Sequence, residues 1–181
     1  MRIIGGKLKG KAFCPPDGYK ARPTTDFAKE GLFNILNNEY EMEGLKVLDL
    51  FSGTGSISFE FASRGAERVY SVEMLPMHAS YIKTQAQALG LTNVTVVRHN
   101  VFDFLLICKE KFDIVFADPP YAIEGLDTLP DRVFSAGILH PGAYFILEHP
   151  QTYDFSSHPM FVKEKKYGNV HFSFFENSQT L

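Results

Sequence analysis

The chain has 181 residues, 45% of them hydrophobic, and a formal net charge of −3. This length most simply forms one domain that buries enough apolar surface to fold without disulfides. The two cysteines, Cys14 and Cys108, are far apart and show no ligand-like spacing, which favours free thiols in a reducing, cytoplasmic compartment. We find no signal peptide and no run of about 20 apolar residues, so export and membrane insertion are not expected. Because the cysteines show no ligand-like spacing, a metal site is not expected either.

The charge is unevenly distributed along the chain. Residues 1–29 contain seven lysines and arginines against two aspartates, whereas the remainder has eleven basic and nineteen acidic residues. A short basic segment on an acidic body predicts an arm that contacts a polyanion, although a solvated charge run is the alternative. The candidate contact residues are Arg2, Lys7, Lys9, Lys11, Lys20 and Arg22.

The N-terminal segment precedes the first strand of the predicted sheet. The stretch RIIGGKLKGKAF predicts a glycine-turned hairpin, and TTDFAKEGLFNILNN predicts a helix with an apolar face. The residues on that face are Ala28, Leu32, Ile35 and Leu36. We therefore expect residues 1–44 to form a basic hairpin-and-helix extension, followed by a separate domain over residues 45–181.

Short β-branched or aromatic runs alternate with helical segments through the rest of the chain. This alternation indicates crossover units and a parallel sheet of an α/β domain. The expected strands are residues 46–50, 68–73, 94–99, 112–117 and 143–149. One helix should end at Gly65 and another should run from Pro76 to Gly90. The last segment, residues 160–176, predicts an antiparallel hairpin turned at residues 167–169.

Polar and glycine residues follow the predicted strands at the sheet edge where open α/β folds bind ligands. DLFSGTGS, residues 49–56, places Asp49, Gly53 and Gly55 at a turn into a helix, which either lets a ligand approach the backbone or only closes a crossover unit. A dinucleotide fingerprint would have a third glycine where Ser58 stands, and Asp49 would repel a pyrophosphate. NAD and FAD are therefore disfavoured.

Polar residues at the ends of the next two predicted strands restrict the class of ligand. Glu73 is suited to hydrogen bonds from two ribose hydroxyls, or is a solvated surface glutamate. Asn100 either offers its amide to an adenine edge or caps the following helix. Together these groups fit a cationic, adenosine-bearing ligand without phosphates, which S-adenosylmethionine is. The expected cofactor residues are Asp49, Phe51, Gly53, Thr54, Gly55, Glu73, Met74, Asn100 and Val101.

The fourth strand is followed by DPPY, residues 118–121. The exocyclic amine of a nucleobase is a weak nucleophile because its lone pair is delocalised into the ring. Hydrogen bonds from the amine to Asp118 and to a carbonyl of Pro119 or Pro120 would localise that lone pair and stabilise developing positive charge. Tyr121 would stack on the base once it is turned out of its helix or loop. The alternative is a rigid Pro-Pro turn with Tyr121 packed inward.

These motifs resemble a known family. VLDLFSGTGSISFEFASRGA, Glu73 and DPPY are similar to Rossmann-like amino-methyltransferases, and MRIIGGKLKGKAF with RPTTDFAKEGLFNIL resembles the bacterial RsmD branch. The resemblance covers nearly the whole chain. It implies a seven-stranded, mostly parallel sheet with helices on both faces, and S-adenosylmethionine as methyl donor. It also implies methylation of a guanine N2 amine in 16S ribosomal RNA, within an assembled or assembling small subunit.

The resemblance implies that residues 1–44 are an RNA-binding extension and that residues 45–181 are the methyltransferase catalytic domain. The family roles fall on the residues already singled out, with three departures. Phe27 stands where a basic residue is frequent, Ser58 replaces a frequent glycine, and Asn100 replaces a frequent aspartate. The oxygen of Asn100 can still accept from an adenine amine. Two other functions stay open: an adenine-N6 methyltransferase acting on DNA or RNA, and a non-enzymatic RNA-binding module.

Overall fold

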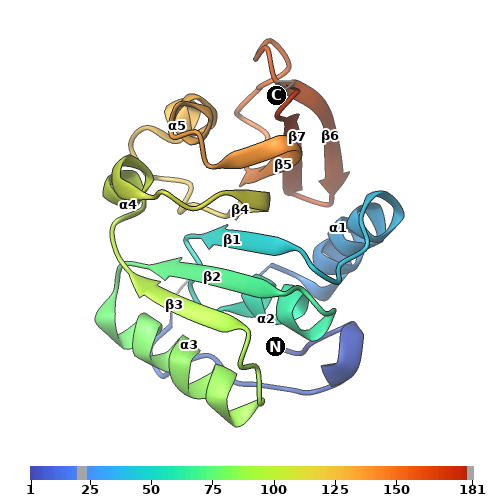
Figure 1. Cartoon of the computed structure of the whole chain (residues 1–181), viewed down its shortest axis with the longest axis vertical. Helices are drawn as coiled ribbons and strands as arrows, with labels where there is room; N and C mark the ends of the chain where they lie inside the picture. Colours follow the sequence, from blue (N-terminus) through green and yellow to red (C-terminus); the bar gives the residue numbers. More distant parts are fainter. Residues whose placement is uncertain (20–23, 179–181) are drawn as a thin grey trace.

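The fold is built on one seven-stranded sheet. The computed structural model describes residues 1–19 and 24–178, and the strand order is β3-β2-β1-β4-β5-β7-β6 (Figure 1). The strands are β1 (Lys46–Leu50), β2 (Arg68–Glu73), β3 (Val94–Arg98), β4 (Phe112–Ala117), β5 (Leu139–His149), β6 (Phe161–Tyr167) and β7 (Val170–Glu176). Strands β1 to β5 pair in parallel, and β7 runs antiparallel to both β5 and β6. The predicted sheet is confirmed.

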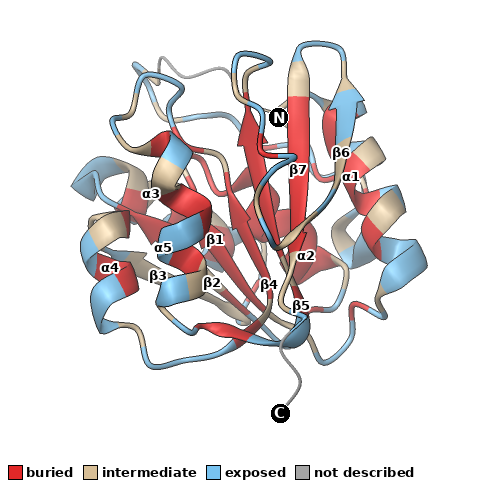
Figure 2. Ribbon diagram, turned by 90° about the horizontal axis from the view of Figure 1, so that it is seen from above, coloured by how far each residue is buried: buried red, intermediate tan, exposed pale blue. Residues whose placement is uncertain are grey.

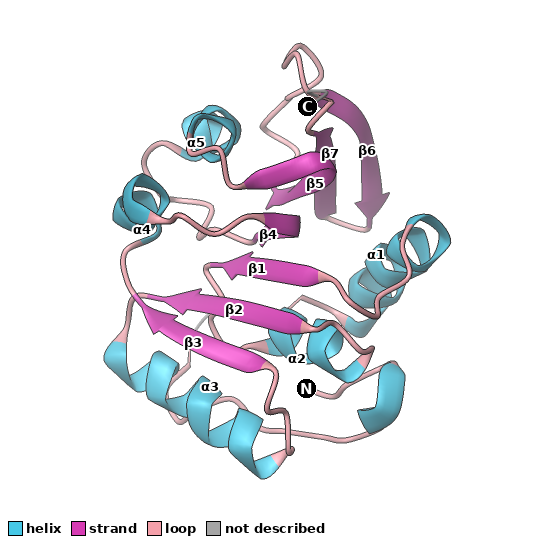
Figure 3. Cartoon of the chain, in the orientation of Figure 1, coloured by secondary structure: helices cyan, strands magenta, loops and turns pink. Residues whose placement is uncertain are grey.

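Helices cover both faces of the sheet, as expected (Figures 2 and 3). The helices are α1 (Asp26–Glu39), α2 (Ser56–Ser63), α3 (Pro76–Ala88), α4 (Val101–Ile107) and α5 (Leu129–Ser135), with short 3₁₀ turns η1 (Gly6–Leu8) and η2 (Leu126–Thr128). Buried side chains of α1, α2 and α3 join one apolar cluster, and those of α4 and α5 join the other. None of the helices in the described part of the chain is long and apolar enough to cross a membrane.

Local signals set most of the element boundaries. The Thr25 hydroxyl caps α1 by accepting from the Ala28 amide at 3.2 Å, and Pro76 opens α3. On α1, Ala28, Leu32 and Leu36 are buried and Ile35 is half-buried. Two strand bounds differ from the prediction: β3 ends at Arg98, and β5 begins four residues early at Leu139, beyond a register shift against β4.

The predicted N-terminal hairpin is only partly formed. Its two arms pair through one isolated antiparallel bridge, Arg2 with Ala12, and the turn between them contains η1 instead of a tight glycine turn. The turn also docks on the end of α2, where the Leu8 amide donates to Ser63 Oγ at 2.9 Å and that hydroxyl donates to the Gly5 carbonyl at 2.7 Å. These bonds add to the main-chain bonds between the arms, in which the Ile3 amide donates to the Lys11 carbonyl at 2.9 Å.

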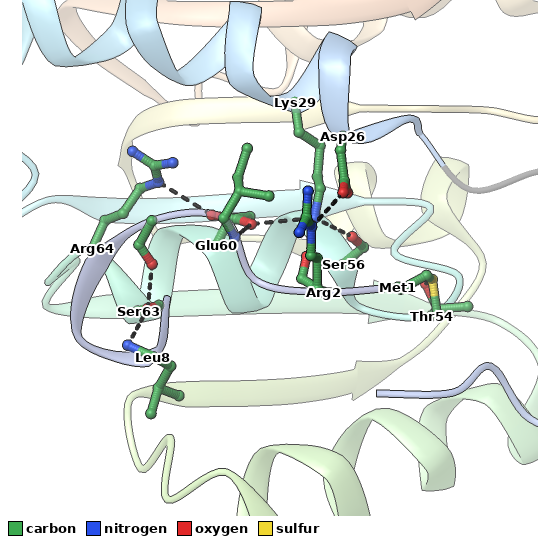
Figure 4. Close-up of polar contacts among 12 residues, drawn as sticks. Met1, Arg2, Leu8, Asp26, Lys29, Thr54, Ser56, Glu60, Ser63 and Arg64 are labelled. Atoms are coloured by element: carbon green, nitrogen blue, oxygen red, sulfur yellow. Dashed lines mark hydrogen bonds and ion pairs between the residues drawn. The ribbon is translucent and has the colours of Figure 1, made fainter. Parts of the chain in front are cut away.

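A buried lysine holds this segment against the domain (Figure 4). Lys29 on α1 is 1% exposed, and its Nζ lies 3.2 Å from Glu60 Oε1 on α2. The same ammonium donates to the Arg2 carbonyl at 2.6 Å and to Ser56 Oγ at 3.2 Å. One cation therefore joins the N-terminal segment, α1 and α2.

Glu60 completes the network from the other side. It accepts from the Ile4 amide at 2.6 Å and from Arg64 Nε at 3.2 Å, and it is fully buried. Ile3 and Phe13 of the N-terminal segment lie in the same apolar cluster as the α1 and sheet residues. The N-terminal segment and the sheet therefore share one core.

Removing the buried cation should destabilise the fold. Lys29→Met leaves Glu60 in an apolar environment with only Arg64 to compensate it, so we expect a loss of about 2–4 kcal/mol in unfolding free energy. Lys83→Met, on an exposed position of α3, removes the same charge and should change stability by less than about 0.5 kcal/mol. Urea denaturation measures both, and equal values for the two variants would contradict this assignment.

Candidate active site

The parallel register brings three carboxylates to one edge of the sheet. Asp49 on β1 is the partner of Phe116 on β4, which is in turn the partner of Ile146 on β5. Asp118 and Glu148 lie two residues beyond Phe116 and Ile146. Because successive side chains alternate between the faces of a sheet, all three carboxylates project on the same face.

Asp49 is buried at this edge of the sheet and is bonded to a serine. It is 1% exposed, and its Oδ2 lies 2.5 Å from Ser58 Oγ, which is also 3.0 Å from Ser71 Oγ. Burial raises the pKa of Asp49 to about 7, and the charge of Asp118 adds to this effect while the Ser58 hydroxyl opposes it. Ser58, where the family often has glycine, thus positions the first carboxylate.

The glycine motif forms a tight loop between β1 and α2. Gly53 has φ +57° and Gly55, which precedes α2, has φ +77°. A Cβ on Gly53 would lie 2.7 Å from Tyr19 Oη, and one on Gly55 would lie 2.9 Å from the Phe59 ring. The positive φ favours glycine at both positions, and at Gly55 the packed Phe59 ring also leaves no space for a side chain.

Glu73 ends β2 and closes this loop. Its Oε2 accepts from the Gly53 amide at 3.0 Å and its Oε1 from the Leu75 amide at 2.8 Å, with the whole residue 8% exposed. The alternative of a solvated surface glutamate is wrong. Each carboxylate oxygen retains capacity to accept a further hydrogen bond.

Asn100 caps α4. Its Oδ1 accepts from the Phe102 and Asp103 amides at 2.9 and 3.3 Å. The expectation that this oxygen accepts from an adenine amine therefore has to be corrected, because the helix end already occupies it. The Nδ2 group lies 3.7 Å from Sδ of Met74, which is 55% exposed, and stays available to a ligand.

The DPPY segment follows β4 as a turn. Pro119 is buried and Pro120 is exposed, and the Pro120 carbonyl accepts from the Ile123 amide at 2.9 Å. Tyr121 is 45% exposed, so it is not packed inward. Its Oη lies 3.5 Å from Glu148 Oε1.

Three site residues were missed by the sequence reasoning. Glu148 is 4% exposed, and its Oε2 accepts from the Thr24 hydroxyl at 3.2 Å. Tyr19 lies over Gly53, and burial raises its pKa to about 12. The sequence held a signal for Glu148, because it lies near the end of a predicted strand and Asp118 likewise follows one. It held none for Tyr19 and Thr24, which lie in a segment without hydrophobic periodicity.

Asp118 and Glu148 influence each other's protonation. Burial raises the pKa of Glu148 to about 7, while hydrogen bonds from Thr24 and Tyr121 oppose the shift. Burial also raises the pKa of Asp118 well above its ordinary value, and the neighbouring Glu148 charge raises it further. Two adjacent carboxyl groups of this kind titrate as a pair.

The expected RNA-contacting residues are not gathered at this edge. Lys7, Lys9 and Lys11 are exposed, but η1 docks at the Ser63 end of α2, about 12 Å along the helix from the glycine loop. Arg2 pairs with Asp26 at 2.6 Å. Lys20 and Arg22 lie outside the described residues.

Comparisons with known proteins agree over nearly the full chain. The family model described as conserved hypothetical protein 95 matches residues 1–176. Ribosomal RNA small subunit methyltransferase D of Buchnera aphidicola subsp. Baizongia pistaciae is 30% identical over 181 residues, which cover 98% of this chain and 92% of the relative. The structure of a hypothetical protein from Thermus thermophilus is 31% identical, with a TM-score of 0.86 and coverage of 97% of this chain and 99% of that one. The Escherichia coli protein yhhF is 28% identical, with a TM-score of 0.87 and coverage of 99% of both chains.

The raised pKa of Asp49 predicts a pH-dependent stability in the ligand-free protein. Because the folded pKa, about 7, exceeds the unfolded value of about 3.9, the contribution of Asp49 is fully present below about pH 4 and is lost as pH rises through about 7. Between pH 5 and 8 the wild type should therefore lose roughly 1–3 kcal/mol relative to Asp49→Asn. Asp127→Asn, at an exposed site, is the control, and urea titrations in which Asp49→Asn parallels the wild type at every pH would refute the shift.

Proposed function

Because this chain belongs to the ribosomal RNA small subunit methyltransferase D family, we propose that it transfers a methyl group from S-adenosylmethionine to the N2 amine of a guanine in 16S ribosomal RNA. The observation that carries the proposal is the meeting of the glycine loop, Glu73 and the DPPY turn at one edge of the sheet. An assembled or assembling small subunit is the form of substrate that we expect.

The cofactor side is formed by the ends of β1, β2 and β3. Glu73 can accept from the ribose hydroxyls with the oxygen capacity that its two backbone bonds leave free. Asn100 Nδ2 and the exposed Met74 side chain, which lie 3.7 Å apart at the Met74 sulfur, would flank the adenine. Asp49, a buried carboxylate with a raised pKa, is suited to a cationic ligand, which would favour its charged form.

The base side is formed by the DPPY turn. Asp118 and the Pro119 carbonyl accept the two amine hydrogens, since the Pro120 carbonyl closes the turn, and Tyr121 stacks on the base. S-adenosylmethionine supplies an electrophilic methyl group on a sulfonium. The N2–C bond forms as the S–C bond breaks, the sulfur leaves as a neutral thioether, and one amine proton is lost. Asp118 is the carboxylate that can accept it, because its pKa is raised well above the ordinary value.

Mass spectrometry of ribosomal RNA nucleosides tests the function. Cells that lack the gene should lose N2-methylguanosine from one position of 16S ribosomal RNA, and the wild-type gene should restore it. Loss of N6-methyladenosine instead, or an unchanged nucleoside profile, would overturn the proposed function.

Asp118 should matter for turnover and not for cofactor binding. Asp118→Ala removes the group that stabilises charge on the amine, so we expect turnover to fall at least about a hundredfold while S-adenosylmethionine affinity stays near wild type. Single-turnover kinetics and calorimetry measure the two effects. Asp127→Ala, at an exposed position of η2, should leave both unchanged, and substantial turnover by Asp118→Ala would contradict the role.

The basic arm should act through phosphate contacts. Each phosphate neutralised contributes about 0.7–0.9 to the log–log salt slope of binding, so changing Lys7, Lys9 and Lys11 together to Ala should flatten that slope by roughly 2–3 units. Cofactor affinity should not change, because these lysines lie at the far end of α2. The matched control changes three exposed lysines outside the arm, Lys83, Lys109 and Lys111. An unaltered slope in the arm variant would remove the arm from the RNA interface.

A further inference from the structure

Glu148 has no role in the chemistry described above, yet it lies beside the base side of the site. It follows Leu147 on β5, whose Cα partner on β4 is Ala117, and Ala117 is followed by Asp118. Neighbouring strands lie about 4.8 Å apart, and these two side chains project on the same face. The two carboxylates are therefore adjacent.

The two oxygens of Glu148 are held differently. Oε2 accepts from the Thr24 hydroxyl at 3.2 Å, on the side of the N-terminal segment. Oε1 faces the half-exposed Tyr121, whose hydroxyl lies 3.5 Å away. That separation exceeds the usual range for a hydroxyl donor, so Oε1 is only weakly bonded and is directed towards the residue that would grip the base.

Purine bases differ at ring atom N1, which lies on the Watson–Crick edge. Guanine carries two adjacent donor groups on its Watson–Crick edge, the N1–H and the N2 amine, whereas N1 of adenine and of 2-aminopurine is an acceptor. A carboxylate accepts hydrogen bonds and, when ionised, donates none. It therefore pairs with guanine N1–H and repels an N1 lone pair.

We propose that Glu148 selects guanine as the target base, with its Oε1 accepting the N1–H while Asp118 accepts from the N2 amine. This inference rests on the proposed function and deepens it by naming the residue that discriminates among purines. When Tyr121 stacks on the base, its hydroxyl moves away from Glu148 Oε1. The long contact between these two oxygens is then replaced by a hydrogen bond from guanine N1–H to the ionised Glu148 carboxylate. Thr24 keeps the other oxygen in place.

The test compares two bases that both carry the reactive 2-amine. Small subunits are reconstituted with 16S ribosomal RNA that bears guanine or 2-aminopurine at the methylated position. Single-turnover rates are then measured for the wild type, Glu148→Gln and Glu124→Gln. Glu124 is exposed just after the DPPY turn, and Glu124→Gln removes the same charge, so it is the matched control.

The wild type and the control should both prefer guanine by about 10- to 100-fold, the range for one hydrogen bond to a charged group. Glutamine can donate its amide to N1 of 2-aminopurine and still accept from guanine N1–H with its oxygen. Glu148→Gln should therefore lower the guanine preference at least tenfold, chiefly by raising the rate on 2-aminopurine. A residue with a purely structural role would slow both substrates by one factor and leave their ratio unchanged.

Two results would overturn the inference while the proposed function stands: a wild type that methylates both bases at similar rates, or a Glu148→Gln ratio equal to that of the wild type. The first needs no variant and so does not depend on folding of Glu148→Gln. A wild type that forms no N2-methylguanosine on the guanine-containing subunit would instead overturn the proposed function, and this inference with it.

Discussion

The site depends on the parallel register of β1, β4 and β5, which places Asp49, Asp118 and Glu148 on one face at one edge of the sheet. Three full negative charges so close together would repel one another. Burial is the main cause that raises the pKa of all three carboxyl groups; the charge of Asp118 adds to it for Asp49, and the charge of Glu148 adds to it for Asp118. The sheet edge is thus suited to a cation and to hydrogen-bond donors.

The N-terminal segment completes this edge. The buried pair of Lys29 and Glu60 fixes the segment against α1 and α2, and it shares the apolar core of the sheet. Further along the same segment, Tyr19 covers Gly53 on the cofactor side, and Thr24 binds Glu148 on the base side. A segment expected from its charge to contact RNA therefore also contributes directly to the walls of the candidate active site.

The sequence predicted what depends on local pattern. Some features depend only on a few consecutive residues, so they can be inferred without knowing the fold. They are the alternation of residues in the strands, the start of α3 at Pro76 and the glycine loop. Contacts between residues far apart in the sequence could not be inferred in this way. Thr24 and Glu148 are separated by 124 residues, and no sequence pattern near either residue predicts their hydrogen bond. The docking of the N-terminal turn on Ser63, 55 residues away from Leu8, could not be inferred for the same reason.

The protonation of the three carboxyl groups should change during the proposed reaction. A sulfonium and a base with two donors both favour ionised carboxylates, so binding of the substrates should draw protons off Asp49 and the pair of Asp118 and Glu148. After the proposed transfer the thioether is neutral, so a nearby sulfonium charge no longer favours the ionised form of Asp49. The methylated amine has one hydrogen fewer to donate to Asp118 or to the Pro119 carbonyl. The proposed transfer therefore removes one cation and one hydrogen-bond donor from the site.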